Sequence, residues 1–435
     1  MRIAGRHLAA AACSGPALLA GGVAHAQLNP TLIRTVVLPE FSRDRNQSVT
    51  ERARPDFDPI GVQVGSFVIN PALAVINGVT SNVLLLDADR RTDVYTIYQP
   101  TLRAASDWSR HRIALDAAGD FQRYAANPAR NQDAGYVNVQ GRLDVSNRLI
   151  AAADAQVSRV FESPISDDVV VNNTYFSHYN RRAVSLRGIY TGGRIRVTGL
   201  LDQNVFQFDD LRLLSGGRRS QATRDRTINR ATATVEYGVT PTVAFYGQMI
   251  VDDTSYPTRL VGGVRNRDSL GTIALAGVNF DVAGLMRGAL GIGYTYRNYR
   301  SDRFGDASGV SAQGRVDFFP TELTTVGLSL QRQIQDANLG NGSAYIDKRI
   351  GIDADHELLR NLIVSASASR TQRSYFDIDA LTNVTLANVR GQFQMTRSLS
   401  FGLATSYTAV APSGAVPFSI RATEWRGQLS MRIRR

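Results

Sequence analysis

The chain has 435 residues and a formal net charge of +11, and it is 43% hydrophobic and 20% charged. This composition is too apolar for a disordered chain, and no run of about 18 apolar residues follows the N-terminus, which excludes a transmembrane helix. The basic residues are spread among aspartates and form no run interleaved with aromatic side chains, so no nucleic-acid partner is expected.

Residues 1–26 have the pattern of a cleavable export signal. Arg2 and Arg6 precede an apolar stretch at 8–23, and Ala24-His25-Ala26 is an A-x-A cleavage motif. The alternatives are a retained N-terminal helix and a lipid anchor on Cys13, which is the only cysteine. Cleavage would leave a chain without disulfides in an oxidising compartment.

Residues 27–59 are charged and have no apolar period, and we predict a flexible leader in the periplasm. A two-residue period begins near Ile60, so residues 60–435 are predicted to form the folded domain. In the first strand the apolar face changes, and a bulge near Gly65 would explain the change.

The alternation places one apolar and one strongly polar face on each predicted strand. At 424–434, Trp425, Leu429 and Ile433 point one way, and Glu424 and Arg426 point the other. The polar face carries Arg, Asp, Gln and Asn, where the core of a soluble sandwich needs apolar side chains. The pattern therefore favours a wall between lipid and water.

Short turns and longer polar connections alternate along the same stretch. This is typical of an antiparallel, up-and-down transmembrane β-barrel with short periplasmic turns and longer extracellular loops. Counting hairpins predicts an all-β fold of about 18 strands, with 16 as the alternative. An even number places both termini in the periplasm.

Several stretches resemble the putative β-barrel porin 2 family of bacterial outer-membrane proteins. The likeness covers nearly all of the exported chain and includes Phe57-Asp58-Pro59-Ile60-Gly61, Asp107-Trp108-Ser109-Arg110-His111, Gly277-Val278-Asn279-Phe280, Gly291-Ile292-Gly293-Tyr294 and Arg373-Ser374-Tyr375-Phe376. The resemblance implies a barrel in the outer membrane of a Gram-negative bacterium, a link to exopolysaccharide or capsule export, and no catalytic residues. The chain departs from the family at residues 77–83. The resemblance implies an acidic Asp-Asn pair there that could bind an ion, but this chain has Asn77 and Asn82 without a carboxylate.

The residues give little sign of an enzyme. A catalytic histidine needs a nucleophile or a carboxylate within reach. His178 follows Ser177 and His356 follows Asp355, but adjacent residues on a strand face opposite ways. His111 has no serine or acidic residue next to it. No zinc spacing, nucleophile elbow or phosphate loop is present. We therefore expect no catalytic residue, no cofactor and no metal.

The inward face of the barrel is the predicted functional surface. Its charged side chains either create an electric field across an aqueous lumen or form ion pairs that brace the wall. We favour bracing for most of them. Tyr246 is the clearest inward aromatic residue. The candidates are Arg112, Asp116, Arg142, Asp144, Asp154, Arg187, Arg196, Asp202, Arg230, Glu236, Tyr246, Arg297, Arg315, Asp317, Arg349, Asp353, Asp355 and Arg426.

The leading hypothesis is a pore through which an exopolysaccharide or capsular polymer leaves the periplasm. The first alternative is a general diffusion porin for small solutes, in which the loop at 209–225 would fold inward as an anion-selective constriction of Arg212, Arg218, Arg219 and Arg224. An outer-membrane enzyme and a structural or surface-attachment barrel are the others.

The expected partners are outer-membrane lipid, the outer-membrane assembly machinery acting through the C-terminal strand, and, for polymer export, a polysaccharide and periplasmic export proteins. The C-terminal strand ends Ile433-Arg434-Arg435, without the aromatic residue that commonly ends outer-membrane strands.

Overall fold

The computed structural model describes residues 46–162, 177–213, 216–337, 342–376, 378–414 and 421–435. The predicted signal peptide and residues 27–45 of the predicted leader lie outside these ranges. None of the helices in the described part of the chain is long and apolar enough to cross a membrane.

Almost every ordered element is a β-strand. The strands and the short 3-10 turns are β1 (Val62–Val64), β2 (Phe67–Thr80), β3 (Asp93–Ser106), β4 (Arg112–Tyr124), η2 (Pro128–Arg130), β5 (Gln132–Asp144), β6 (Leu149–Phe161), β7 (His178–Gly192), β8 (Ile195–Phe208), β9 (Leu211–Arg212), β10 (Arg218–Arg219), η3 (Ala222–Arg224), β11 (Arg226–Gly238), β12 (Val243–Ser255), η4 (Val261–Gly263), β13 (Ser269–Val282), β14 (Met286–Tyr299), β15 (Ala307–Thr321), β16 (Thr324–Asp336), β17 (Ala344–Leu359), β18 (Leu362–Tyr375), β19 (Ala380–Gln394), β20 (Leu399–Gly414) and β21 (Ala422–Arg434).

The strands form one closed antiparallel barrel. Each wall strand pairs with the next along the chain, and β21 closes the wall on β2, with Ala72 opposite Arg434 and Thr80 opposite Arg426. The sheet has 19 strands including β1, which pairs only with β2, so the wall itself has 18. The prediction of an 18-strand barrel is confirmed over the alternative of 16.

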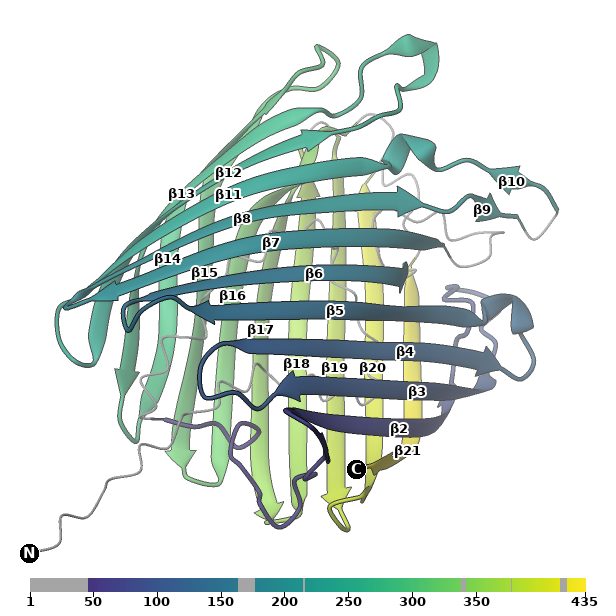
Figure 1. The fold of residues 1–435 in the computed structure, drawn as a ribbon. Helices are drawn as coiled ribbons and strands as arrows, with labels where there is room; N and C mark the ends of the chain where they lie inside the picture. Colours follow the sequence, from purple (N-terminus) through teal and green to yellow (C-terminus); the bar gives the residue numbers. More distant parts are fainter. Residues whose placement is uncertain (1–45, 163–176, 214–215, 338–341, 377, 415–420) are drawn as a thin grey trace, which may run out of the picture.

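The near and far walls cross steeply (Figure 1). The strands from β3 to β8 run across the view, whereas β17 to β21 stand nearly upright behind them. Strands of a closed barrel must tilt against its axis, so opposite walls slope in opposite directions. The C-terminus and the described N-terminal segment lie at the same end of the barrel.

The start of the wall corrects the prediction of a bulge near Gly65. The chain reverses there, with Gly65 at φ +59°, and β1 folds back on β2 with Val62 opposite Ile69. A left-handed φ suits a residue without a Cβ, so Gly65 allows a tight hairpin. The wall therefore begins at Phe67, and β2 is the strand that β21 closes on.

The two faces of the wall differ as the alternation predicts. On β21, Trp425, Leu429 and Ile433 are 58%, 60% and 53% exposed on the outside, while Glu424 is 4% exposed on the inside. Large exposed apolar side chains recur along the other wall strands. A band of apolar side chains around a closed wall is favourable only against lipid, which defines a membrane-spanning barrel.

The connections also alternate in length. Those at the end that holds the C-terminus are short, such as 193–194, 322–323 and 360–361, and most at the other end are longer, such as 81–92 and 256–268. The end with short turns is therefore the periplasmic end.

Candidate functional site

All eighteen inward candidates lie on the face opposite the outward apolar side chains. On β11, for example, Arg230 and Glu236 alternate with exposed Val235 and Tyr237. Register brings opposite charges together between strands: Arg230 lies opposite Asp202 of β8, and Glu236 lies opposite Arg196. The interior is thus a polar surface built from side chains far apart in sequence.

The most enclosed of these groups surrounds Arg297 near the extracellular end. Its guanidinium lies 2.8 Å from an oxygen of Asp252 and 3.4 Å from one of Asp336. It also donates to the hydroxyl of Ser269 at 2.9 Å, and the Tyr299 hydroxyl donates to Asp336 at 2.6 Å. One cation thus holds together two carboxylates from different strands.

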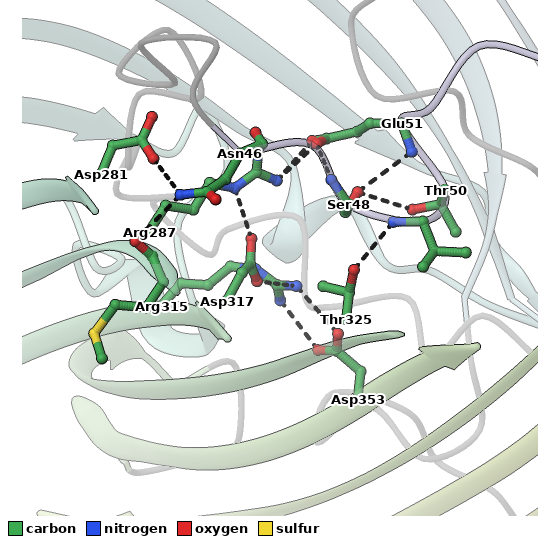
Figure 2. A network of polar contacts seen from close by, with 12 residues as sticks. Asn46, Ser48, Thr50, Glu51, Asp281, Arg287, Arg315, Asp317, Thr325 and Asp353 are labelled. Atoms are coloured by element: carbon green, nitrogen blue, oxygen red, sulfur yellow. Dashed lines mark hydrogen bonds and ion pairs between the residues drawn. The ribbon is translucent and has the colours of Figure 1, made fainter. Parts of the chain in front are cut away.

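A second network lines the periplasmic half of the lumen (Figure 2). Arg315 on β15 reaches Asp317 at 2.9 Å and Asp353 on β17 at 3.1 Å. Arg287 on β14 lies 3.2 Å from Asp317 and 2.8 Å from Glu51, which belongs to the segment before the barrel. The ion pairs therefore continue from the wall to the N-terminal segment.

Residues 46–58, which we call the strap, are hydrogen-bonded to the inside of the periplasmic rim. The side-chain amide of Asn46 donates to Asp281 at 2.6 Å. The side-chain oxygen Oδ1 of Asn46 accepts a hydrogen bond from the backbone amide of Gly284 at 2.8 Å. The backbone amide of Val49 donates to the hydroxyl of Thr325 at 3.0 Å. Sequence reasoning predicted a flexible leader here and did not find these contacts.

The rest of the strap follows the rim towards the closing strand. Arg54 pairs with Glu357 of β17 at 2.9 Å. Arg397, in the turn between β19 and β20, donates to the carbonyl of Pro55 at 3.2 Å, and Arg434 donates to that of Phe57 at 2.9 Å. The strap thus lines the mouth from β13 to β21 and then enters the β1–β2 hairpin.

Glu51 is the titratable group that connects the strap to Arg287. Burial by itself would raise the pKa of Glu51. The hydrogen bond from the Ser48 amide, at 3.0 Å, and the charge of Arg287 outweigh that effect and hold the pKa of Glu51 below its ordinary value. Glu51 is therefore anionic at neutral pH, as the ion pair requires.

The extracellular end of the lumen is more aromatic than predicted. Besides Tyr246, which was expected from the sequence, several other inward aromatic residues are buried in clusters at this end. Tyr95 and Tyr124 pack with Val83 of the following loop, and Tyr299 packs with Phe304 of another loop. Further inward aromatic residues in such clusters are Tyr179, Phe206, Phe208, Tyr345 and Tyr375. Loop residues therefore pack against the inside of this mouth.

Tyr246 is inward-facing but only 8% exposed. A Cβ at Gly277 would lie 2.5 Å from its ring, and one at Gly291 would lie 2.2 Å from its hydroxyl. The ring therefore lies against the wall over two glycines of neighbouring strands. Little of its surface remains for stacking on a sugar.

The structure does not bring the four arginines of the proposed constriction loop together. Arg212 and Arg218 face each other across the β9–β10 hairpin, next to Arg219, and this hairpin projects beyond the end of the barrel (Figure 1). Arg224 is instead buried, ion-paired with Glu162 and 4.1 Å from the centre of the Phe208 ring. Arg224 thus braces the rim, away from the exposed hairpin.

Several inward arginines were not among the candidates: Arg103, Arg390, Arg432 and Arg434. Arg432 and Arg434 share the inward face of β21 with Arg426, so the alternation alone identifies them. Arg390 was missed because β19 has apolar residues on both faces. Arg103 follows Pro100, where the pattern of β3 is hard to recognise from sequence.

The three histidines in the described part of the chain make local contacts. His356 Nδ1 lies 2.9 Å from the Thr324 hydroxyl, and the His178 ring packs against Phe161. His111 Nδ1 accepts a hydrogen bond from the Asp144 amide at 3.1 Å. Within the described ranges, no cluster of three or more His, Cys, Asp or Glu side chains could hold a metal ion.

Fold and interior together define a membrane-spanning β-barrel of the outer-membrane, porin-like class. Residues 54–435 match the model of the family described as putative beta-barrel porin 2, and the chain belongs to that family. The family and fold are those of a channel.

Among solved structures, Pseudomonas aeruginosa OccK2 (OpdF) in complex with glucuronate is similar, with 12% identity, a TM-score of 0.46 and coverage of 84% of this chain and 98% of that one. OpdK from the same organism has 13% identity and a TM-score of 0.43, with coverage of 84% and 99%. No curated protein matches the chain. The function proposed below therefore rests on the family and on the geometry of this chain.

Proposed function

We propose that this protein is a passive outer-membrane channel for small hydrophilic solutes. Barrels of about 16–18 strands are wide enough to enclose an aqueous channel, and the inward face of this one carries charged and amide side chains on most strands. The paired charges, such as Arg315 with Asp317, brace the wall and present polar groups to water. This favours diffusion without tight binding.

One observation favours small solutes over a polymer: chain segments line the inside of both mouths. The strap lies along the periplasmic rim, and loop residues such as Val83 and Phe304 pack inside the extracellular rim. Each segment reduces the cross-section that the wall alone would leave. Exopolysaccharide passage, the leading hypothesis from the sequence, gains no support from the family match or from this geometry.

The test is swelling of liposomes that contain the refolded protein, in sugars from monosaccharides to long oligosaccharides. We expect fast entry of the smallest sugars and a steep decline with size, because the mouths are lined. Equally fast entry of long oligosaccharides would instead support a polymer path. A barrel that folds but neither swells liposomes nor conducts in a planar bilayer would refute the channel itself.

A further inference from the structure

The inward charges are unevenly distributed around the barrel. From β8 to β18, several inward arginines face carboxylates: Arg230 and Asp202 lie 3.9 Å apart, and Arg373 and Asp347 lie 3.4 Å apart. The five consecutive wall strands β19, β20, β21, β2 and β3 differ. We call these five strands the seam sector, because they contain the pair that closes the barrel.

The seam sector has two acidic residues, and both are already engaged near its extracellular end. Glu424 accepts hydrogen bonds from Thr80 at 2.5 Å and from Arg426 at 2.7 Å. Asp93, at the first position of β3, accepts a bond from Asn127 at 2.8 Å. Below them, the charged residues on the inward face of these described strands are all arginines: Arg103, Arg390, Arg432 and Arg434.

These arginines extend from the periplasmic mouth towards the middle of the wall. Arg434 lies opposite Ala72, and Arg432 lies opposite Ala74 on one side and Ser400 on the other. Arg390 lies opposite Ala404, farther from the mouth. Ala72 lies between Arg434 of β21 and Thr101 of β3, and Arg103 is two residues beyond Thr101, so Arg103, Arg432 and Arg434 share one region of the lumen.

The carboxylates that reach this group belong to its edges. Asp116 of β4 lies 3.1 Å from Arg103. Asp355 of β17 lies opposite Ser365 of β18, which in turn lies opposite Arg390. Asp58 follows Phe57, whose carbonyl accepts a hydrogen bond from Arg434. The neighbouring inward residues of the sector are small, such as Ala72, Ala74 and Gly402. Small neighbours leave the long arginine side chains room to reach into the lumen.

We propose that the seam sector makes the channel selective for anions, with small anionic solutes moving along its arginines. This inference rests on the proposed channel function and names the class of solute. Fixed positive charges on a low-dielectric wall concentrate anions, and several weak sites in sequence allow an ion to enter and leave. Guanidinium groups suit carboxylates and other oxyanions, because they offer paired N–H donors.

The test is the reversal potential of single channels under a KCl gradient, repeated with potassium gluconate. We expect the unmodified protein to pass chloride better than potassium, and the preference to weaken at 1 M salt, where the screening length falls to about 3 Å. The variant R390Q/R432Q should move the ratio of chloride to potassium permeability towards one while the channel still conducts. R390K/R432K, which keeps both charges, should preserve the preference.

The matched control is R230Q/D202N, which also changes two inward side chains but removes an arginine together with the aspartate that it faces, so the net charge of the lumen stays the same. It should shift the ratio less than R390Q/R432Q. Ser406→Glu adds a carboxylate to the inward face of β20 and should lower chloride preference without removing any arginine.

A conducting channel that shows no preference for chloride, or equal shifts in R390Q/R432Q and R230Q/D202N, would overturn the inference and leave the channel function standing. A folded barrel that never conducts would remove both.

Discussion

The Arg297 cluster offers a direct test of how charges inside this barrel contribute to its stability. Replacing Arg297 with Gln removes a cation that contacts both Asp252 and Asp336. The three side chains are 5%, 1% and 8% exposed, so solvent replaces little of the lost interaction. Two carboxylates would then remain close together in an enclosed site.

Removing one partner of a buried ion pair typically costs 3–5 kcal/mol, because the other charge is left uncompensated. We expect a loss of about 3 kcal/mol here, at the lower end of that range, since water in the lumen can reach part of the site. That loss corresponds to a change of roughly 100-fold in the unfolding equilibrium. Adding Asp252→Asn to the Arg297→Gln variant should recover part of it, because one uncompensated charge is removed.

The control is Arg123→Gln. Arg123 pairs with Asp133 at 2.6 Å, but the two side chains are 44% and 58% exposed, and such pairs contribute about 0–1 kcal/mol. The assay is urea unfolding in lipid vesicles followed by tryptophan fluorescence. Trp108 and Trp425 are the two tryptophans and both are exposed on the barrel, so their emission changes as they leave lipid. The reasoning fails if Arg297→Gln costs no more than Arg123→Gln, or if Asp252→Asn deepens the loss.

Three further predictions concern the strap and the wall. Deleting residues 46–58 should raise single-channel conductance while the barrel still folds, because the strap lines the mouth without pairing in the wall; unchanged conductance would show that it does not narrow the path. Glu51→Gln should weaken the attachment of the strap at neutral pH. The pKa of Glu51 in the folded protein is lowered below its ordinary value of 4.5. Ionised Glu51 therefore stabilises the attached strap above a pH of about 4.5, and this stabilisation is lost as the pH falls through the folded-state pKa. The variant and the parent should differ in conductance at pH 7 and converge under strongly acidic conditions. Gly293→Ala should impair folding, because the added Cβ would lie 1.9 Å from the Ala274 carbonyl oxygen, whereas Gly391→Ala should fold normally in open space; band-shift electrophoresis compares their folded fractions.

Local patterns went far in predicting the fold. Strand alternation depends only on the pleat, so Arg426 and Leu429 were assigned to opposite faces without knowledge of their neighbours. The pattern failed where apolar residues face inward: on β13, Ile273 and Leu275 pack against Ile250 inside the barrel, and no clear face could be recognised. At Gly65 the change of face came from a hairpin, which reverses the chain where a bulge would only shift it.

The partners of the inward charges could not be predicted in the same way. Arg315 reaches Asp353 on a strand two positions along the wall, and Arg287 meets Glu51 more than 200 positions earlier in the chain. Such contacts depend on strand register and on side chains that cross intervening strands. The strap was missed because its anchoring groups belong to the rim of the barrel, and its own sequence has no period.

The sequence by itself determined the class of fold, the number of strands and the face on which most side chains lie, because these follow from a two-residue repeat and the spacing of turns. The tertiary structure decided which charges meet, where the strap lies and which side of the lumen carries arginines with few carboxylates on the same strands. Those features arise only when β21 closes on β2 and fixes the register around the whole barrel. Closure brings together inward residues from both ends of the chain, such as Thr101 and Arg434 on either side of Ala72, and no local pattern encodes that proximity.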